Sequence, residues 1–173
     1  EITPTLILDI HKGGKMKKLL LATIIGIAFL SGCASVPMES SLATDSAKEF
    51  KLPATKNAGV YVYRDDSSFG AALKKSVWIN GDCVGETAKG VFFYHEVEGN
   101  KEHRISTESE FSKNDIILYL ESRKLYFIRQ FIKLGVFVGG AGLEVKDTEE
   151  GMREVSKLNL AQKGVCGNTS TLK

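Results

Sequence analysis

The 173-residue chain has little of several features that would indicate its class. It contains only three cysteines, three prolines and one tryptophan, and its formal net charge is +2. It has no C-x-x-C, H-E-x-x-H, P-loop or G-x-S-x-G motif, so no common sequence signature of catalysis is present. The sequence also lacks the clustered basic residues of a nucleic-acid binder, and we expect no nucleic-acid partner.

The longest apolar run, Leu19–Leu30, is too short to cross a membrane. As a helix its twelve residues would extend about 18 Å, against roughly 30 Å of hydrocarbon in a bilayer. Two lysines precede the run, and the small residues Ser31 and Gly32 follow it, which is typical of a secretory signal. We therefore predict a signal peptide over residues 16–32, with a buried core helix as the alternative.

The sequence L-S-G-C at the end of this run, Leu30 to Cys33, resembles a bacterial lipobox. The resemblance implies that a diacylglycerol is attached to the sulfur of Cys33, that the chain is cut before this residue, and that the new amino group is acylated. This covalent lipid is the only cofactor expected, and a lipid bilayer is the expected partner. Residues 1–15 do not fit the pattern, and we interpret them as an overextended gene start or a cloning remnant.

Removal of the predicted leader would leave a neutral chain that suits one domain. Residues 1–32 hold four of the 23 basic and two of the 21 acidic residues, which leaves 19 of each. The remaining chain of about 140 residues is enough for one hydrophobic core. Residues 33–57 are polar and rich in Ser, Thr and Ala, which predicts a flexible tether. We expect a β domain over residues 58–146, and a short helix with a loose tail over residues 147–173.

The central segment predicts a mainly β fold, an antiparallel β-sandwich of the Ig-like or prealbumin-like kind. Short apolar stretches are separated by turn residues every 8–12 residues or so. Asn80-Gly81 is the strongest hairpin signal. Residues 125–132 carry a single polar residue on each face, so this strand is expected to be buried on both sides. Further along, Asp147 and Glu150 have the spacing of a helix N-terminus, although Gly151 weakens that helix.

Cys83 and Cys166 remain as a pair once Cys33 carries lipid. An oxidising compartment favours a disulfide between them, with two separate thiols as the alternative. Trp78 stands between two aliphatic residues and is predicted to anchor the core, with stacking on a ligand or partner as the alternative.

Four stretches together resemble a family of bacterial lipoproteins classed only as a domain of unknown function. They are VYVYR (60–64), VWINGDCVGET (77–87), KGVFFYHEVEGNKEHRIST (89–107) and LYFIRQ (125–130). The middle stretches are more loosely similar to PEGA-type repeats, small β-modules of envelope proteins. The resemblance implies a compact β-sandwich held at an envelope membrane. Ala34-Ser35 after the cysteine resemble lipoproteins of the outer membrane that face the periplasm.

Two groups of residues are candidate binding sites. His95 and His103 flank the turn at residues 98–100, and with Glu96 they would offer imidazole and carboxylate ligands to zinc. The alternative is a set of polar residues that only solvate a hairpin. Phe137 belongs to a glycine-rich apolar stretch that would contact a partner or the membrane, with a simple turn as the alternative.

These patterns predict a non-enzymatic lipoprotein of the bacterial cell envelope. Its domain would be a structural or interaction module that presents surface and strand edges to another envelope protein or to cell-wall material. A receptor for a small ligand or metal, built on the histidine hairpin, is the alternative. A hydrolase of envelope polymers is less supported, because no nucleophile or acid–base pair stands out and no catalytic residue is assigned.

Overall fold

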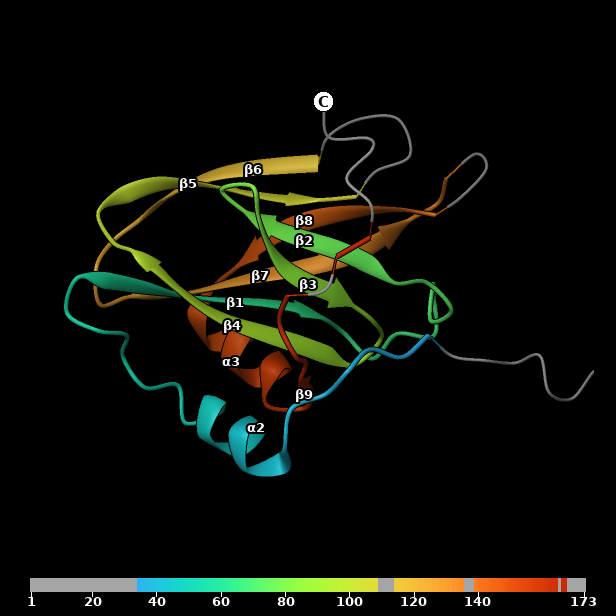
Figure 1. Cartoon of the computed structure of the whole chain (residues 1–173), viewed down its shortest axis with the longest axis horizontal. Coiled ribbons are helices and arrows are strands. Elements are labelled where there is room, and N and C mark those ends of the chain that lie inside the picture. Colours follow the sequence, from blue (N-terminus) through green and yellow to red (C-terminus); the bar gives the residue numbers. More distant parts are fainter. Residues whose placement is uncertain (1–33, 109–113, 136–138, 165, 168–173) are drawn as a thin grey trace, which may run out of the picture. The chain divides into compact units, whose positions relative to one another are not determined.

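The computed structural model describes residues 34–108, 114–135, 139–164 and 166–167. Within these ranges the chain forms two β-sheets and two helices in three layers (Figure 1). A five-stranded sheet lies in the middle, with a four-stranded sheet on one face and the helices on the other. The predicted mainly β, sandwich-like fold with a C-terminal helix is confirmed.

The middle sheet has the strand order β8-β7-β1-β4-β9, and the four-stranded sheet has the order β3-β2-β5-β6. The strands of the middle sheet are β1 (Asn57–Arg64), β4 (Val91–Glu98), β7 (Leu125–Lys133), β8 (Gly140–Lys146) and β9 (Asn159–Leu160). Those of the other sheet are β2 (Lys75–Ile79), β3 (Asp82–Thr87), β5 (Lys101–Thr107) and β6 (Asn114–Leu120). The helices are α2 (Ser41–Ala47) and α3 (Thr148–Val155).

Two strand pairs depart from the antiparallel arrangement that we predicted. β1 pairs in parallel with β7, where Tyr63 lies opposite Arg129, and β4 pairs in parallel with β9. Parallel neighbours need a long crossover connection. Between β1 and β7 the chain therefore builds the whole four-stranded sheet and β4. As a result, the C-terminal ends of β1 and β7 lie at the same end of the domain (Figure 1).

Side chains of the middle sheet fill two separate cores. The core between the sheets consists mainly of aliphatic residues: Ala58, Val60, Val62, Val77, Ile79, Val84, Val91, Phe93, Val97, Ile105, Leu120, Ile128 and Ala161. The core under the helices is largely aromatic: Tyr61, Tyr63, Phe92, Phe127, Val155 and Leu158. Because successive residues of a strand point to opposite faces, β1 supplies both cores and is buried on both sides. β7 shows the predicted double burial at Phe127 and Ile128, each 0% exposed.

The turn between β2 and β3 is the predicted tight hairpin. Asn80 and Gly81 have φ angles of 54° and 92°, in the left-handed region that a two-residue hairpin turn requires. Ile79 then lies opposite Asp82, at the start of the antiparallel ladder. This element follows from local sequence alone.

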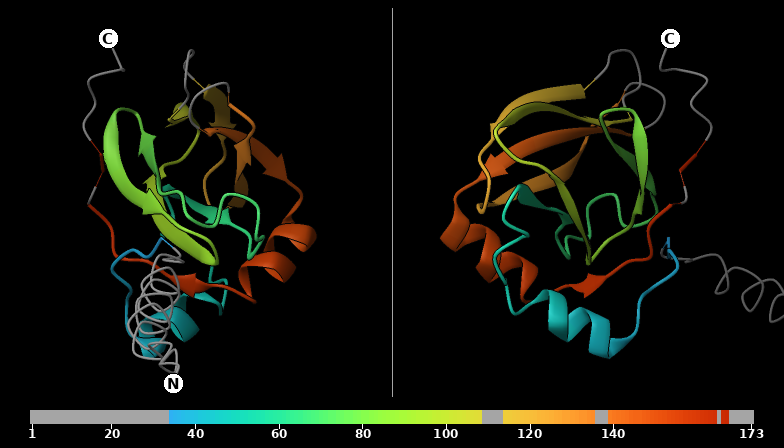
Figure 2. Two further views of the ribbon diagram at one scale, coloured as in Figure 1. Left: turned by 90° about the vertical axis from the view of Figure 1, so that its right-hand side faces the viewer. Right: turned by 60° about the vertical axis from the view of Figure 1, so that its left-hand side comes forward.

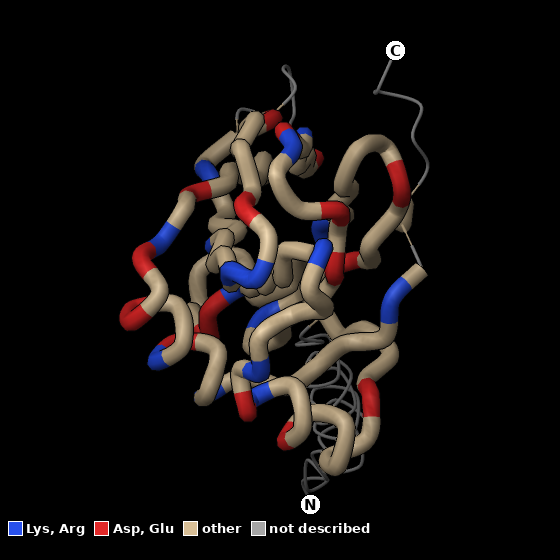
Figure 3. The backbone as a smooth tube through the Cα atoms, turned by 90° about the vertical axis from the view of Figure 1, so that its left-hand side faces the viewer, with Lys and Arg blue, Asp and Glu red and all other residues tan. Residues whose placement is uncertain are grey.

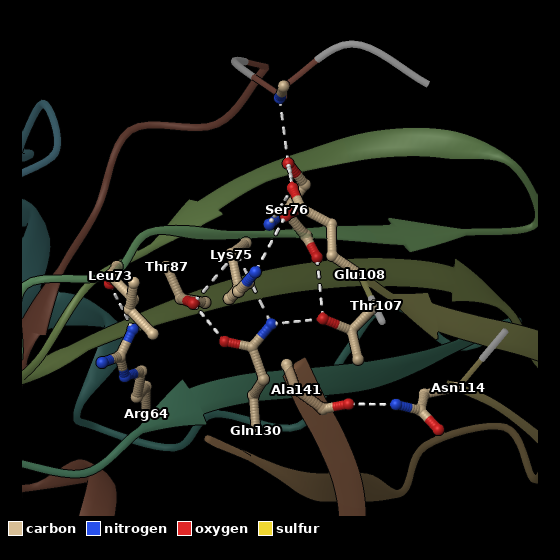
Figure 4. A network of polar contacts seen from close by, with 11 residues as sticks. Arg64, Leu73, Lys75, Ser76, Thr87, Thr107, Glu108, Asn114, Gln130 and Ala141 are labelled. Atoms are coloured by element: carbon tan, nitrogen blue, oxygen red, sulfur yellow. Dashed lines mark hydrogen bonds and ion pairs between the residues drawn. The ribbon is translucent and has the colours of Figure 1, made fainter. Parts of the chain in front are cut away.

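A buried glutamine joins the two sheets (Figure 4). Gln130 of β7 is 0% exposed, and its amide nitrogen donates to Thr107 Oγ1 of β5 at 2.6 Å. Its amide oxygen accepts a hydrogen bond from the hydroxyl of Thr87 in β3. The carbonyl oxygen of Lys75 is 3.0 Å from the Thr87 hydroxyl, so it shares the single proton of this hydroxyl with Gln130. Thr107 donates to the carbonyl of Ser76 at 2.9 Å. The one polar residue on this face of β7 is therefore fully paired inside the core, as a buried amide must be to avoid a large desolvation cost.

A disulfide bond joins Cys83 of β3 to Cys166, as predicted, with their Cα atoms 6.0 Å apart. The two residues are separated by 83 positions, so the bond closes a long loop. On the chain-entropy model a loop of this size stabilises the fold by roughly 4 kcal/mol.

The predicted loose tail is attached to the domain as far as Gly167. β9 adds a short strand to the middle sheet beside β4, and Gly167 N–H donates to Ser76 Oγ at 2.9 Å. The stretch that was expected to be loose is GNTSTLK (167–173), and of it only Gly167 is described, where this hydrogen bond holds it next to the disulfide-bonded Cys166. Residues 168–173 lie outside the described residues.

The helix predicted near residue 147 is confirmed as α3. Asp147 is its N-cap, and the carboxylate accepts from Glu150 N–H at 2.8 Å. Gly151, which weakens the helix locally, is the residue at which α3 meets the sheet. A Cβ atom built at Gly151 would lie 2.1 Å from Cγ of Phe127. The helix can approach β7 this closely only because residue 151 has no side chain.

We expect Gly151→Ala to destabilise the domain by about 1–3 kcal/mol, because the new methyl group overpacks against Phe127. The direction of this change separates the steric contact from helix propensity, because alanine stabilises a helix by about 1 kcal/mol relative to glycine when no contact opposes it. Urea denaturation of the purified protein measures the change. Arg153→Ala, at an exposed position of the same helix, should stay within about 0.5 kcal/mol of the wild type. A Gly151→Ala variant more stable than the wild type would contradict the close approach.

Candidate functional site

The segment before β1 is folded onto the domain, which corrects the prediction of a flexible tether over residues 33–57. It contains α2, whose N-cap Ser40 accepts from Ala43 N–H at 3.1 Å. Tyr61 of β1 donates its hydroxyl proton to the carbonyl of Ala47 at 2.7 Å. Phe50 lies beside the ring of Tyr61, with centroids 5.4 Å apart. The segment is polar in composition, but Ala47 and Phe50 pack against the aromatic face of the middle sheet.

The start of the described chain is also held against the domain. Ala34 N–H donates to the carbonyl of Ala71 at 3.1 Å, in the loop between β1 and β2. Cys33, the predicted lipidation site, is the preceding residue and lies outside the described residues.

The β1–β2 loop that receives Ala34 is held by buried contacts. Arg64, 3% exposed, donates to the carbonyl of Leu73 at 2.6 Å and also to the carbonyl of Gly70. Burial lowers the pKa of the Arg64 guanidinium, against the opposing charge of Asp65. These bonds, one of which is drawn in Figure 4, fix the shape of the loop.

Two large apolar side chains are exposed at the same end of the domain. Phe69 in the loop is 52% exposed, and Leu134 after β7 is 87% exposed. Gly70 lies against Ile132 of β7, which joins the loop to the end of that strand. We call Phe69, Ala71 and Leu134 the anchor-end surface. The β1–β2 loop, which carries Phe69 and Ala71, lies where the chain enters the domain (Figure 2). The sequence of this loop begins with Asp-Asp-Ser-Ser (65–68), a composition typical of a turn, and Phe69 is its single aromatic residue.

The histidine hairpin does not assemble the predicted metal-ligand set. His95 and His103 line the same depression, of about 360 Å³, but His95 and Glu96 are consecutive in β4 and point to opposite faces. His103 Nε2 donates to the carbonyl of Glu98 at 2.7 Å, so Nδ1 is left to accept from the amide of Asn80 at 2.9 Å. Both ring nitrogens of His103 are occupied. Within the described ranges no three His, Cys, Asp or Glu side chains are placed to hold a metal ion.

His95 is half-buried, and its imidazole is less basic than usual. Burial lowers the pKa of His95, the charge of Lys163 lowers it further, and Asp82 opposes the shift. Since the ordinary histidine pKa is about 6.5, this side chain is neutral at physiological pH. It therefore adds no positive charge to the depression.

Glu96 instead ties the N-terminal segment to the middle sheet. Its carboxylate accepts from Asn57 Nδ2 at 2.9 Å, from Ala54 N–H at 3.2 Å and from the hydroxyl of Tyr94 at 3.0 Å. The bond from Asn57 lowers the pKa of Glu96 below the ordinary glutamate value, and the other two bonds add to this against the effect of burial. Glu96 therefore has a structural role: it joins β4 to the segment that was predicted to be a tether.

We expect Glu96→Gln to make stability less sensitive to acid. The folded-state pKa of Glu96 is below its unfolded value, so its stabilising contribution is complete above the unfolded pKa and is lost as pH falls through the folded pKa. Urea denaturation at neutral pH and near pH 3 (about 1.3 units below the ordinary glutamate pKa) measures this loss. The difference between the two free energies should be smaller in the variant than in the wild type. Glu102→Gln, at an exposed position of β5, is the control, and equal acid sensitivity of wild type and Glu96→Gln would contradict the assignment.

The two predicted contact residues have different outcomes. Trp78 is 4% exposed, so it is packed within the protein, in line with the core-anchor interpretation. It lies opposite Cys83 in the β2–β3 ladder, beside the disulfide. Stacking on a surface ligand is not open to it in this arrangement. Phe137 lies outside the described residues.

In the described part of the chain, no helix is long and apolar enough to cross a membrane. Fold and disulfide define a small, mainly β domain with three layers, stapled between β3 and the C-terminal segment.

Comparison with known proteins identifies the family. A family model described as "Protein of unknown function (DUF2846)" matches residues 54–141. A protein of Haemophilus influenzae (strain Rd), named only as an uncharacterized protein, is 52% identical over 141 residues, which cover 81% of this chain and 83% of that protein. The chain belongs to this family of unknown function, and the predicted membership of such a family is confirmed. No solved structure matches the chain. The looser likeness to PEGA-type repeats stays a prediction.

Proposed function

We propose that this chain is a lipid-anchored protein of the bacterial cell envelope, placed at the outer membrane and facing the periplasm. The observation that carries the proposal is the disulfide between Cys83 and Cys166, which uses two of the three cysteines. Such bonds persist in oxidising compartments such as the periplasm. The third cysteine, Cys33, follows the apolar run and the lipobox-like L-S-G-C.

The contact of Ala34 with the β1–β2 loop supports an anchor that holds the domain close to the membrane. With lipid on the neighbouring Cys33, the domain would rest directly on the bilayer, and the anchor-end surface would face the headgroups. Phe69 and Leu134 are suited to such a position, because exposed aromatic and aliphatic side chains gain by burial in the interface. Three acyl chains, at about 0.8 kcal/mol per buried methylene, would make the attachment effectively permanent.

We propose further that the domain has a non-enzymatic role in binding another envelope component through β6. This strand is at the edge of the four-stranded sheet, paired with β5 on one side. Ile116 and Leu118 pack toward the core, whereas Ile117 and Tyr119 are each 58% exposed on the outer face. Edge strands offer unpaired backbone groups to an incoming strand, and exposed apolar side chains add affinity. Tyr119 is near the end of β6 that is remote from the β1–β2 loop (Figure 1), so the bilayer would leave it accessible.

Metabolic labelling in the native host tests the anchor. We expect the wild-type protein to incorporate labelled palmitate and to enter the detergent phase on partitioning, because Cys33 is acylated. Cys33→Ser should abolish both results. The double variant Cys83→Ser, Cys166→Ser is the matched control, since it removes two cysteines and should retain the label. Label that persists in Cys33→Ser, or its absence from the wild type, would refute the proposed anchor.

Site-specific photocrosslinking in intact cells tests the role of β6. A photoreactive amino acid at Tyr119 should yield a discrete adduct with one envelope component, because its side chain is exposed at a sheet edge. The same probe at Leu52, which is 59% exposed in the segment before β1, is the control and should give no such adduct. Equal patterns from both positions, or no adduct at Tyr119, would count against binding through β6.

A further inference from the structure

A small cavity of about 200 Å³ lies where α3 meets the middle sheet, away from the histidine hairpin and from β6. Its lining comes from β1, the loop after it, β7, β8 and α3: Tyr63, Asp65, Arg129, Lys146, Glu150 and Glu154. Charges of both signs are mixed over the domain (Figure 3), and five of these six residues carry charge. Nothing in the family description assigns a role to this cavity.

Tyr63 gives the cavity a buried polar group without a partner. The residue is 0% exposed, and its hydroxyl has no hydrogen bond to any of the described residues. Tyr61, two residues earlier on the same face of β1, is 1% exposed and donates to the carbonyl of Ala47. Buried hydroxyls are normally paired, and an unpaired one costs stability. Burial raises the pKa of Tyr63 to about 12, so the hydroxyl keeps its proton and is available as a donor.

Two cations beside Tyr63 have donors left after their ion pairs are counted. Arg129 donates through Nε to Asp65 Oδ2 at 2.9 Å and also through Nη2 to the same oxygen, and its Nη1 is 3.5 Å from Glu144 Oε2. Lys146 Nζ lies 3.0 Å from Glu144 Oε1 and 3.2 Å from Glu150 Oε1. A guanidinium carries five N–H groups and an ammonium carries three. Each cation therefore retains at least one hydrogen for a ligand, and with the Tyr63 hydroxyl these donors suit a carboxylate.

The residues that line the cavity from α3 offer acceptors. Glu150 and Glu154 are four residues apart and so lie on one face of the helix. Their interactions within the described ranges use Oε1: Glu150 with Lys146, and Glu154 with Lys157 at 2.9 Å. Oε2 of each remains to accept a hydrogen bond, and two carboxylates suit an ammonium group.

We propose that this cavity binds a free α-amino acid as its zwitterion. The carboxylate is held by Tyr63, Arg129 and Lys146, and the ammonium group by Glu150 and Glu154. The volume is below the range of about 300–1,000 Å³ that is usual for drug-sized ligands, so the ligand has a short side chain. A ligand with only one of the two charged groups leaves half of the polar wall unused. This site is independent of the lipid anchor and of β6.

Isothermal titration of the purified full-length protein tests the proposal, with glycine, L-alanine and L-serine as ligands. Acetate and methylamine supply the two charged groups separately and should bind much more weakly than the amino acids. Tyr63→Phe should weaken amino-acid binding about tenfold or more, because a hydrogen bond to a charged group is lost. This variant should fold at least as well as the wild type, since it removes only an unpaired hydroxyl. Tyr61→Phe, whose hydroxyl bonds to Ala47, is the matched control and should bind like the wild type.

Three results would overturn the site. The first is that none of these amino acids gives a heat of binding at millimolar concentration with folded protein. The second is that Tyr63→Phe and the wild type bind with equal affinity. The third is that acetate or methylamine binds as tightly as an amino acid. Glu154→Gln gives a second measurement, because it removes charge from the ammonium side alone. It should weaken binding of the amino acids without weakening the binding of acetate, because a negative charge that repels an anion is removed.

Discussion

The double burial of β1 is the constraint on which the rest of the structure depends. One face of this strand carries Val60 and Val62 and needs a second sheet above it; the other carries Tyr61 and Tyr63 and needs a cover of a different kind. Each large apolar side chain removed from water stabilises the fold by about 1.5–3 kcal/mol, so neither face can be left open. The four-stranded sheet covers the first face. Helix α3, α2 and Phe50 cover the second.

This constraint explains why the segment before β1 is folded. A polar segment of this composition has no reason to be ordered by itself, but the aromatic face of β1 lacks cover unless α2 and Phe50 pack on it. The carboxylate of Glu96 then closes the junction by bonding Asn57 and the backbone of Ala54. Because this segment is held along its length, Ala34 reaches the β1–β2 loop, and the proposed anchor is brought against the body of the domain.

The buried polar side chains of this fold are of two kinds, one with hydrogen-bond partners and one without. Gln130 lies between the sheets with both ends of its amide paired, which makes it part of the core and gives it no visible role in binding. Tyr63 lies under α3 with its hydroxyl unpaired and with charged groups around it. Folding stability alone accounts for the first residue and not for the second. For this reason the cavity at Tyr63, rather than the histidine hairpin, is the place where a ligand is best accommodated.

Local chemistry in the sequence predicted a good part of this protein: the Asn80-Gly81 hairpin, the Asp147 cap of α3, the mainly β fold, and a disulfide between Cys83 and Cys166 with separate thiols as the alternative. Each depends on residues close in the chain or on a count of cysteines. Strand alternation could also have shown that His95 and Glu96 face opposite ways. The parallel pairing of β1 with β7, the folded N-terminal segment and the cavity at Tyr63 were decided only by the tertiary structure. They depend on contacts between residues far apart in the chain, and the free energy of those contacts cannot be read from the local composition of either segment.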